Sequence, residues 1–575
     1  MGLMLGFLCL YVAFVPMLLP RVWWLQAIGG AINASVGYFI GFVISNLITF
    51  FVLLLAKPQN RYFSFMKGMP WGRINRWLVI IGLVILIGFA VHHYRVTHLI
   101  ATQMDAMLPT PVTVFASVVL SLLGWWVLVV VARLVVDGIS ALIDAGMLKR
   151  PKLMQWSAKA LLVTALICTL VLISRDYLWH KVVEKVAYHA MSLNQSTPNN
   201  LTAPTSPYKS GFKPDAKTTG DTTQAPPAQT WEELGHYGQR FVSLGVSQAD
   251  IASVANQIPN QANNQTIKEP IRVFVGLNHQ EPNPALLDDV VDMALAEMDR
   301  TGAFNRRYIV VQGATGRGWI EEYSSQAVEY LTYGDVASVA IQYSYLPSQF
   351  SFMLDDDAAI YANHRLIKAV ETRLAALPKH SRPKLLLAGE SLGAYASQSP
   401  FTTQESLLSR VDGAVWVGTP RFSPLWQHLV AQRDKPSTEA LPVIDGGKHI
   451  RFMDDPQSLQ IGDALDWQSP RIVFVQYATD PIVWWSKTLI WQKPDWMGEP
   501  QGRGVAHMPT WLPLLTFWEL SLDMPASGNT PAGFGHIYED DIVYAWANVL
   551  GNTQIEPQQI AEKIEKHLQI TEFDK

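Results

Sequence analysis

Residues 385–396 read LLLAGESLGAYA, and the rest of the chain can be interpreted outward from this stretch. The apolar run 385–388 predicts a buried strand and residues 394–396 favour a helix, so the sequence Gly-Glu-Ser-Leu-Gly at 389–393 falls in a sharp turn between them. In such a nucleophile elbow the serine has a strained backbone, and the glycines let a neighbouring strand and helix pass where a Cβ would clash. We therefore predict that Ser391 is a nucleophile whose hydroxyl is exposed at the edge of a sheet.

Length and composition divide the chain into two parts. The 575 residues exceed one ordinary core, and the apolar residues are concentrated in the first third of the sequence. A mean hydropathy of +0.12 therefore averages a membrane part with a soluble part. The net charge of −4, without a basic stripe, gives no reason to expect nucleic acid as a partner. Cys9 and Cys168 both lie in apolar runs and offer no disulfide framework or zinc site, so no metal or cofactor is implied.

Five long apolar segments come first and predict a bundle of transmembrane helices. Each is near or above the roughly 20 residues that a helix needs to cross a bilayer. They cover approximately residues 1–19, 28–55, 77–93, 112–136 and 157–174. The first segment has the position of a signal peptide, but it lacks a basic start and a small-x-small cleavage site, so we expect a retained helix. The near absence of charge inside the segments favours an anchor over a transport path.

Basic residues predict the orientation of this bundle. The connections after the second and fourth segments are rich in Lys and Arg, whereas those after the first and third hold about one basic residue each. The rich connections contain Lys57, Arg61, Lys67, Arg73 and Arg76, and then Arg133, Lys149, Arg150 and Lys152. The positive-inside rule places both in the cytoplasm. With five crossings of an inner membrane, the N-terminus is then cytoplasmic and everything after the fifth segment is periplasmic or extracellular.

The remaining sequence predicts a linker followed by an α/β domain. Residues 193–229 are rich in Pro, Ser, Thr and Asn and nearly free of large apolar groups, so we expect no folded core there. This divides the chain into a transmembrane domain over 1–178, a juxtamembrane segment and disordered linker over 179–229, and a catalytic domain over 230–575. In the last of these, short apolar runs alternate with amphipathic helical stretches.

The alternation predicts a mostly parallel sheet. Strands are expected at Ile271–Gly276, Tyr308–Gln312, Val336–Tyr343, Lys384–Ala388, Ala414–Val417 and Arg471–Tyr477, with helices near 284–300, 321–331, 358–376 and 393–409. The acidic run Asp355-Asp356-Asp357 precedes the third helix. Three carboxylates in a row are also found at metal sites, but acids are favoured at a helix N-terminus by capping and by the dipole, which we prefer here.

The predicted elements before Ser391 follow the order strand, helix, strand, helix, strand. In this order the chain resembles the α/β-hydrolase fold. In that fold the nucleophile follows the fifth strand, and the oxyanion hole uses the N–H after the serine and one from the loop after the third strand. The resemblance implies oxyanion donors at Leu392 and Gly313, the latter in the loop Gln312–Trp319. That loop lacks the Gly-Lys-Ser/Thr ending of a P-loop and the Gly-x-Gly-x-x-Gly spacing of a dinucleotide-binding turn. Its glycines therefore favour backbone donors for an oxyanion over a phosphate-binding loop.

The same resemblance implies a triad acid and then a histidine, in that order. Asp480 lies in the turn after the strand at 471–477, where either a catalytic acid or a turn-forming Asp before Pro481 is expected. His536 lies in the glycine-flanked loop Gly533–Tyr538 and is the preferred base, with His507 as the rival. No strand is evident before His536, so its assignment rests on chain order and loop character.

The whole plan is similar to a family of predicted bacterial membrane-anchored α/β-hydrolases with an N-terminal multi-helix domain. The motifs that carry the resemblance are GESLG at 389–393, WVGTPRFSP at 416–424 and GFGH at 533–536. What it implies is a Ser-His-Asp triad of unspecified substrate, formed by Ser391, His536 and Asp480.

These residues predict a serine hydrolase that acts on an acyl ester through an acyl-enzyme. An acyltransferase would use the same triad with an alcohol as acceptor, so it stays an alternative. A non-catalytic binding module and an accessory domain of a transporter are further alternatives, against which the complete set of Ser, Asp and His argues.

The interval between Asp480 and His536 is rich in tryptophan, which favours a lipid-like substrate. Hydrolases of this fold commonly carry a cap between their late strands. This interval contains Trp484, Trp485, Trp491, Trp496, Trp511 and Trp518. Core packing explains about half of such residues, but tryptophan also lines apolar pockets and membrane interfaces. Because the domain is tethered beside a bilayer, we expect a lipid or another acyl ester as substrate.

Overall fold

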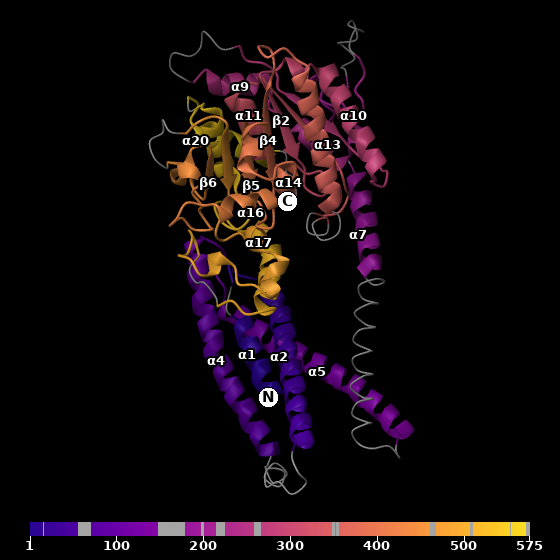
Figure 1. The fold of residues 1–575 in the computed structure, drawn as a ribbon, viewed down its shortest axis with the longest axis vertical. Helices are drawn as coiled ribbons and strands as arrows, with labels where there is room; N and C mark the ends of the chain where they lie inside the picture. The colour runs from indigo at the N-terminus through magenta and orange to yellow at the C-terminus, as the bar shows by residue number, and fades with distance from the viewer. Residues whose placement is uncertain are drawn as a thin grey trace. The chain divides into compact units, whose positions relative to one another are not determined.

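A parallel sheet of seven strands forms the centre of the C-terminal half of the chain (Figure 1). The structure is a computed structural model, and it describes residues 1–575 except 15–16, 56–70, 148–178, 197–200, 214–224, 258–265, 348–350, 352–355, 461–466, 506–509, 553 and 571–575. The strands are β1 Ile271–Val275, β2 Tyr308–Gly313, β3 Val336–Ile341, β4 Lys384–Glu390, β5 Gly413–Val417, β6 Ile450–Met453 and β7 Arg471–Val475, in the order β1-β3-β2-β4-β5-β7-β6. All neighbouring pairs are parallel, and the expected α/β architecture is confirmed.

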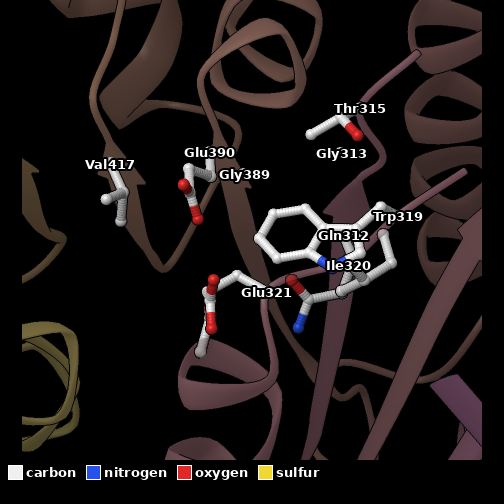
Figure 2. Close-up of a pocket in the computed structure, with 10 residues that line it drawn as sticks. Gln312, Gly313, Thr315, Trp319, Ile320, Glu321, Gly389, Glu390 and Val417 are labelled. Atoms are coloured by element: carbon white, nitrogen blue, oxygen red, sulfur yellow. The ribbon is translucent and has the colours of Figure 1, made fainter. Parts of the chain in front are cut away.

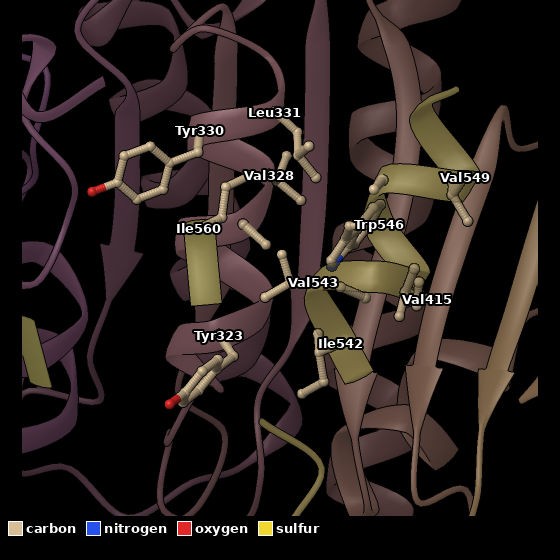
Figure 3. Packing of buried hydrophobic residues seen from close by; sticks show 14 of the residues in the cluster. Tyr323, Val328, Tyr330, Leu331, Val415, Ile542, Val543, Trp546, Val549 and Ile560 are labelled. Atoms are coloured by element: carbon tan, nitrogen blue, oxygen red, sulfur yellow. The ribbon is translucent and has the colours of Figure 1, made fainter. Parts of the chain in front are cut away.

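Helices cover both faces of this sheet, because the apolar strands must be buried on either side. The helices are α7 Trp179–Asn194, α8 Gly235–Ser243, α9 Gln248–Ala255, α10 Pro284–Thr301, α11 Glu322–Leu331, α13 Asp356–Ala375, α14 Leu392–Gln398, α15 Gln404–Leu408, α16 Pro424–Ala431, α17 Pro481–Trp484, α19 Glu539–Leu550 and α20 Pro557–Ile570. Figure 3 shows α11, α19 and α20 packing against the sheet through residues such as Val328, Trp546 and Ile560. The elbow strand β4 therefore lies in the middle of a fully buried layer.

The observed strands agree with the predicted ones to within two residues, and β6 is additional. This strand has four residues, IRFM, between Lys448-His449 and Asp454-Asp455. A run this short has no measurable periodicity, so it could not be predicted from the residue pattern. The helix expected at 393–409 is also two helices, α14 and α15, because Pro400 cannot continue a helix and Thr403 forms a new capping box.

Part of the expected linker is packed against the sheet domain, contrary to the prediction of a disordered segment. Residues 201–213 are described, and the Tyr208 carbonyl accepts a hydrogen bond from the Arg272 N–H of β1 at 3.1 Å. Phe212 is buried, with the Arg300 guanidinium over its ring. These contacts could not be predicted from the polar composition of the segment. One buried aromatic ring and backbone hydrogen bonds hold it against the sheet domain.

Apolar helices precede the sheet domain: α1 Gly2–Ala13, α2 Trp23–Leu55, α4 Trp71–Gln103 and α5 Pro111–Met147. Within the described residues, three helices are long and apolar enough to cross a membrane, at Trp23–Ile48, Val79–Gln103 and Pro111–Gly138. The expectation that residues 1–19 form a spanning helix is wrong by length, because the 12 residues of α1 extend only about 18 Å against a hydrocarbon core of about 30 Å. The fifth expected segment, 157–174, lies outside the described residues.

Small residues allow α1 and α2 to pack closely, as is typical of membrane helices. A Cβ on Gly37 would lie 2.3 Å from the Leu5 carbonyl oxygen, and one on Gly6 would meet the Trp125 ring at 2.3 Å. The apolar core of these helices includes Leu10, Tyr38 and Trp125. The short helix α1 is therefore a packed part of this bundle.

The chain divides into two compact units that are each built from two separate stretches. One unit contains Met1–His180 and Lys487–Pro531, and the other contains Lys181–Ser486 and Ala532–Lys575. We call Lys487–Pro531 the insert. It includes α18 Leu515–Asp523, and it leaves the sheet unit after Asp480 and returns before His536. Most of the residues between the predicted triad acid and base, Lys487–Pro531, thus belong to the unit of the apolar helices.

A buried ion cluster holds the insert within its unit. The Arg21 side chain, 1% exposed, forms ion pairs with Glu519 and with Asp523, the latter at 2.5 Å. Asn33 donates to Glu519, and the Leu18 N–H donates to Asp523 Oδ2 at 3.0 Å. Burial raises the pKa of Glu519 to about 7 even though Arg21 opposes that shift. One cation is therefore shared by two carboxyl groups.

We predict that Arg21→Met loosens the insert, because two buried carboxyl groups lose their cation. Removing one partner of a buried ion cluster costs about 3–5 kcal/mol. The expected result is a lower unfolding temperature of the purified full chain in detergent and faster proteolysis within residues 487–531. Lys181→Met is the matched control, because Lys181 and Glu184 form an exposed pair that contributes less than about 1 kcal/mol. Equal stability of the two variants would contradict a role for Arg21 in docking.

Candidate active site

Ser391 occupies a strained turn between β4 and α14. Its φ of 52° and ψ of −119° are unusual for a residue with a side chain, and such a conformation costs about 1–3 kcal/mol. Its N–H donates to the Val417 carbonyl at 2.9 Å, and its own carbonyl accepts from the Tyr395 N–H at 3.0 Å. The neighbouring strand β5 and the first turn of α14 therefore hold the backbone in this conformation, which is the conformation expected of a nucleophile elbow.

Three glycines make the turn possible. A Cβ on Gly393 would lie 2.1 Å from the Gly313 carbonyl oxygen, and one on Gly389 would lie 2.6 Å from the Gly393 carbonyl. Gly313 and Gly389 are also paired in register where β2 and β4 end. The start of α14 thus rests directly on the ends of two strands.

Asp480 follows β7 and uses its two carboxylate oxygens for different partners. Oδ1 accepts the Ile482 N–H at 2.8 Å and so caps α17, while Oδ2 lies 2.6 Å from His536 Nδ1. The Tyr538 hydroxyl donates to the same Oδ2 at 2.7 Å. Burial and the Asp480 carboxylate raise the pKa of Tyr538 well above its usual range, so this hydroxyl stays a donor. The turn-forming and the histidine-orienting roles foreseen for Asp480 are compatible in one side chain.

His536 is held in a short loop that is attached to the Asp480 turn. The Gly535 N–H donates to Thr479 Oγ1 at 3.0 Å, and Phe534 pairs with Ile537 across the loop. A Cβ on Gly418 would come within 2.4 Å of His536 Cε1, so the absence of a side chain there makes room for the ring. Between β7 and His536 the described residues form no strand, in agreement with the sequence. His507, the rival base, lies outside the described residues.

The other ring nitrogen of His536 faces Glu390, a residue that sequence analysis did not single out. His536 Nε2 lies 3.3 Å from Glu390 Oε1, whereas Ser391 Oγ forms no hydrogen bond to the part of the chain that the structure describes. Burial, and then the nearby Glu321 carboxyl, raise the pKa of Glu390 well above its usual range. The sequence feature that could have identified Glu390 as a site residue is its position, since it is an acidic residue at the end of a buried strand and next to the serine.

The predicted oxyanion donors lie beside the serine and at the end of β2. Leu392 is the first residue of α14, so its N–H has no partner within the helix. Gly313 is the last residue of β2 and is followed by a loop closed by a 3.0 Å hydrogen bond from the Thr315 N–H to the Trp319 carbonyl. That these N–H groups bind an oxyanion stays a prediction.

A small cavity lies where β2 and β4 end, with room for about one water molecule (Figure 2). It is lined by Gln312, Gly313, Thr315, Trp319, Ile320, Glu321, Ser324, Gly389, Glu390 and Val417. The carboxyl groups of Glu321 and Glu390 both line this cavity, and Glu390 directly precedes Ser391 in the sequence. It is too small to be the substrate pocket.

Family comparison agrees with this geometry. Residues 271–563 match a model described as the alpha/beta-hydrolase family, which covers the whole sheet and both partners of the Asp480–His536 pair. The chain belongs to the alpha/beta-hydrolase family. Residues 14–245 match the model of the N-terminus of the same alpha/beta-hydrolase family, which covers α2, α4, α5 and the segment packed on β1. No curated protein and no solved structure matches the chain. Membership in the alpha/beta-hydrolase family indicates a hydrolase-type enzyme.

Proposed function

We propose that this protein is a membrane-anchored serine hydrolase that cleaves acyl esters, with Ser391 as nucleophile, His536 as base and Asp480 as the acid that orients it. The observation that carries the proposal is the 2.6 Å contact between His536 Nδ1 and the buried Asp480. The other ring nitrogen of His536 lies 3.3 Å from Glu390, the residue before a serine with φ of 52°. A buried carboxylate on Nδ1 fixes the tautomer in which Nε2 can accept a proton.

The reaction would follow the usual course for this set of groups. Ser391 Oγ attacks the acyl carbonyl and gives its proton to His536 Nε2, while the imidazolium that forms is stabilised by Asp480. The Leu392 N–H and the loop after β2 would bind the oxyanion. His536 then protonates the leaving alcohol, and water attacks the acyl-enzyme. An alcohol in place of that water would make the same site an acyltransferase.

Proton transfer requires Ser391 Oγ to approach Nε2, which faces Glu390 in this structure. Catalytic hydrogen bonds are often long or unformed without substrate and tighten in the complex. Because the Ser391 backbone is fixed by its hydrogen bonds to β5 and α14, this approach depends on the Ser391 and His536 side chains.

A fluorophosphonate probe tests the nucleophile and base. We expect it to label the wild-type full chain, to leave Ser391→Ala unlabelled, and to label His536→Ala at least about 10³-fold more slowly, since triad members act as a unit. His507→Ala is the matched control and should label at the wild-type rate. Labelling that survives His536→Ala but is lost in His507→Ala would transfer the role of base to His507, and labelling of Ser391→Ala would reject the nucleophile.

A lipid-like acyl ester is the substrate class that we propose. Of the six tryptophans in the late interval, Trp484, Trp485 and Trp496 are buried core residues, whereas Trp491 of the insert is 65% exposed. Leu514 of the insert is 53% exposed as well. The insert belongs to the same unit as the apolar helices, so exposed apolar side chains there favour contact with a bilayer or with acyl chains.

Chain-length preference tests this substrate class. Each buried methylene adds up to about 0.8 kcal/mol of binding, so kcat/KM for p-nitrophenyl esters should rise from C2 toward medium and long chains. Trp491→Ala should reduce the advantage of long chains, and Lys493→Ala, two residues away on the exposed surface, serves as its control. A kcat/KM that falls steadily beyond C2 would argue for small or polar esters instead.

We also propose that the sheet unit lies outside the cytoplasm. The insert contacts residues at the start of α2, such as Arg21 and Asn33, whereas the basic connection Lys57–Arg76 follows the other end of that helix. If the basic connection is cytoplasmic, the insert is on the opposite side of the membrane. The helix α1 runs back along α2, so that Gly2 lies against Tyr38 and Gly41, toward the end of α2 that leads into the basic connection. The cytoplasmic side of the N-terminus stays a prediction.

Reporter fusions at about residue 215 test this orientation. Alkaline phosphatase fused there should be active and a green fluorescent protein dark, because only the first folds in the periplasm. Fusions in the basic connection, near residue 65, are the control and should give the reverse pattern. An active fluorescent reporter at 215 would place the sheet unit in the cytoplasm.

A further inference from the structure

Two glutamates face each other beside the catalytic histidine. Figure 2 shows the carboxyl groups of Glu390, at the end of β4, and of Glu321, at the start of α11, pointing toward one another. Glu321 accepts the Tyr323 N–H at 3.0 Å and thereby caps α11. Glu390 is 8% exposed, and its Oε1 lies 3.3 Å from His536 Nε2. The carboxyl groups and the imidazole thus form a continuous row with Asp480 at its far end.

Two carboxylates in this position cannot both be ionised. Like charges in a site of low dielectric disfavour the second ionisation, so the pair retains one proton and carries one negative charge. Burial raises the pKa of both Glu321 and Glu390, in agreement with a shared proton. A proton between two carboxyl groups forms a strong hydrogen bond, which explains why the two side chains turn toward each other.

We infer that Glu321 and Glu390 form a proton-sharing carboxyl pair that positions the imidazole of His536 and sets its basicity. This inference rests on the proposed function, in which His536 is the base. Neither glutamate touches the reacting carbonyl in that mechanism, so both are positioning residues. They act through the ring nitrogen that receives the serine proton.

The charges around the pair come from every neighbouring element. Arg240 of α8 and the His536 imidazole are the basic groups that face it. Asp480 after β7 and Glu539 of α19 are acidic, as is Glu322 of α11, which is paired with Arg272. Arg240 therefore offsets part of one negative charge on the pair, and the acidic neighbours favour a proton in place of the second.

The location of the shared proton decides how strongly the pair acts on His536. With the proton on Glu390, the negative charge is on Glu321, near Arg240 and away from the ring. With the proton on Glu321, the negative charge is on Glu390, 3.3 Å from Nε2. When His536 takes the serine proton, a shift of the shared proton from Glu390 to Glu321 brings the negative charge to the new cation. No proton enters or leaves the pair in this step, so the charge balance is kept.

Glutamine substitutions fix the charge at one of the two places. In Glu321→Gln the amide donates to Glu390, which stays ionised beside Nε2 and raises the pKa of His536. In Glu390→Gln the amide donates to Glu321, so the charge stays away from the ring and the pKa of His536 falls. The double variant has no charge and should have the lowest pKa. Since a free imidazole is needed to activate Ser391, the rising limb of the pH profile follows this pKa.

The experiment measures the second-order rate of fluorophosphonate labelling of the full chain between pH 5 and pH 9. We expect the midpoint of the rising limb to decrease in the order Glu321→Gln, wild type, Glu390→Gln, double variant, with a total span of about one pH unit or more. Glu405→Gln on α15 is the matched control: Glu405 is exposed, and its variant should keep the wild-type midpoint.

The possible results separate this inference from the proposed function. Labelling that persists in His536→Ala overturns both. Labelling that requires His536 but keeps one midpoint in all glutamine variants overturns the carboxyl pair alone. Poor folding of Glu390→Gln would leave Glu321→Gln decisive, once an unfolding temperature equal to that of the wild type at pH 5 shows that acid unfolding does not cause the upward shift. A downward or absent shift in Glu321→Gln, with its unfolding temperature unchanged, rejects the inference.

Discussion

The rest of the candidate site depends on the close contact between α14 and the ends of β2 and β4. Backbone atoms of Gly393 and Gly313 approach so closely that neither residue tolerates a Cβ. This contact forces the chain to reverse within one residue, and Ser391 accommodates the reversal with a positive φ. The strain is held by the packing of a buried parallel sheet, which is the kind of rigid support that strained functional residues need. A looser helix would let the turn relax and would withdraw the hydroxyl.

Acidic side chains surround the His536 ring on both sides of the candidate site. Asp480 is fully buried, and its charge is balanced by hydrogen bonds from Tyr538 and a helix N-terminus together with the His536 ring. On the other side, Arg272 neutralises Glu322 and Glu329 where α11 packs on β1, and this contact also fixes the start of α11, which carries Glu321. The imidazole therefore lies in a field set by acids on either side. Such an arrangement favours the cationic form that arises in the proposed reaction.

Sequence patterns predicted the parts of the fold that are governed by local periodicity. The strands β1 to β5 and β7 are apolar runs bounded by polar turns. The elbow contains glycines at the positions where the backbone of α14 contacts the strand ends. Asp480 and His536 were predicted from chain order, from the turn after a strand and from the glycine-flanked loop, and the structure brings them together. The role of Glu390 was not visible, because it depends on Glu321, which is 69 positions earlier in the chain and meets it only in the folded sheet. β6 was too short to be recognised. The first apolar segment has the composition of a membrane span, but its helix α1 has only 12 residues, Gly2–Ala13.

The buried contacts of Arg21 have a consequence for biosynthesis. Its carboxyl partner Glu519 is 498 positions later in the chain. While a ribosome makes the apolar helices, this arginine has no counterion from its own unit, and it must remain hydrated or be held by lipid phosphates or insertion factors until the sheet unit is nearly finished. The last strand is complete before the insert appears, and α19 and α20 are made after it. Docking of the insert is therefore a late step, which follows synthesis of all seven strands, and the insert itself precedes α19 and α20.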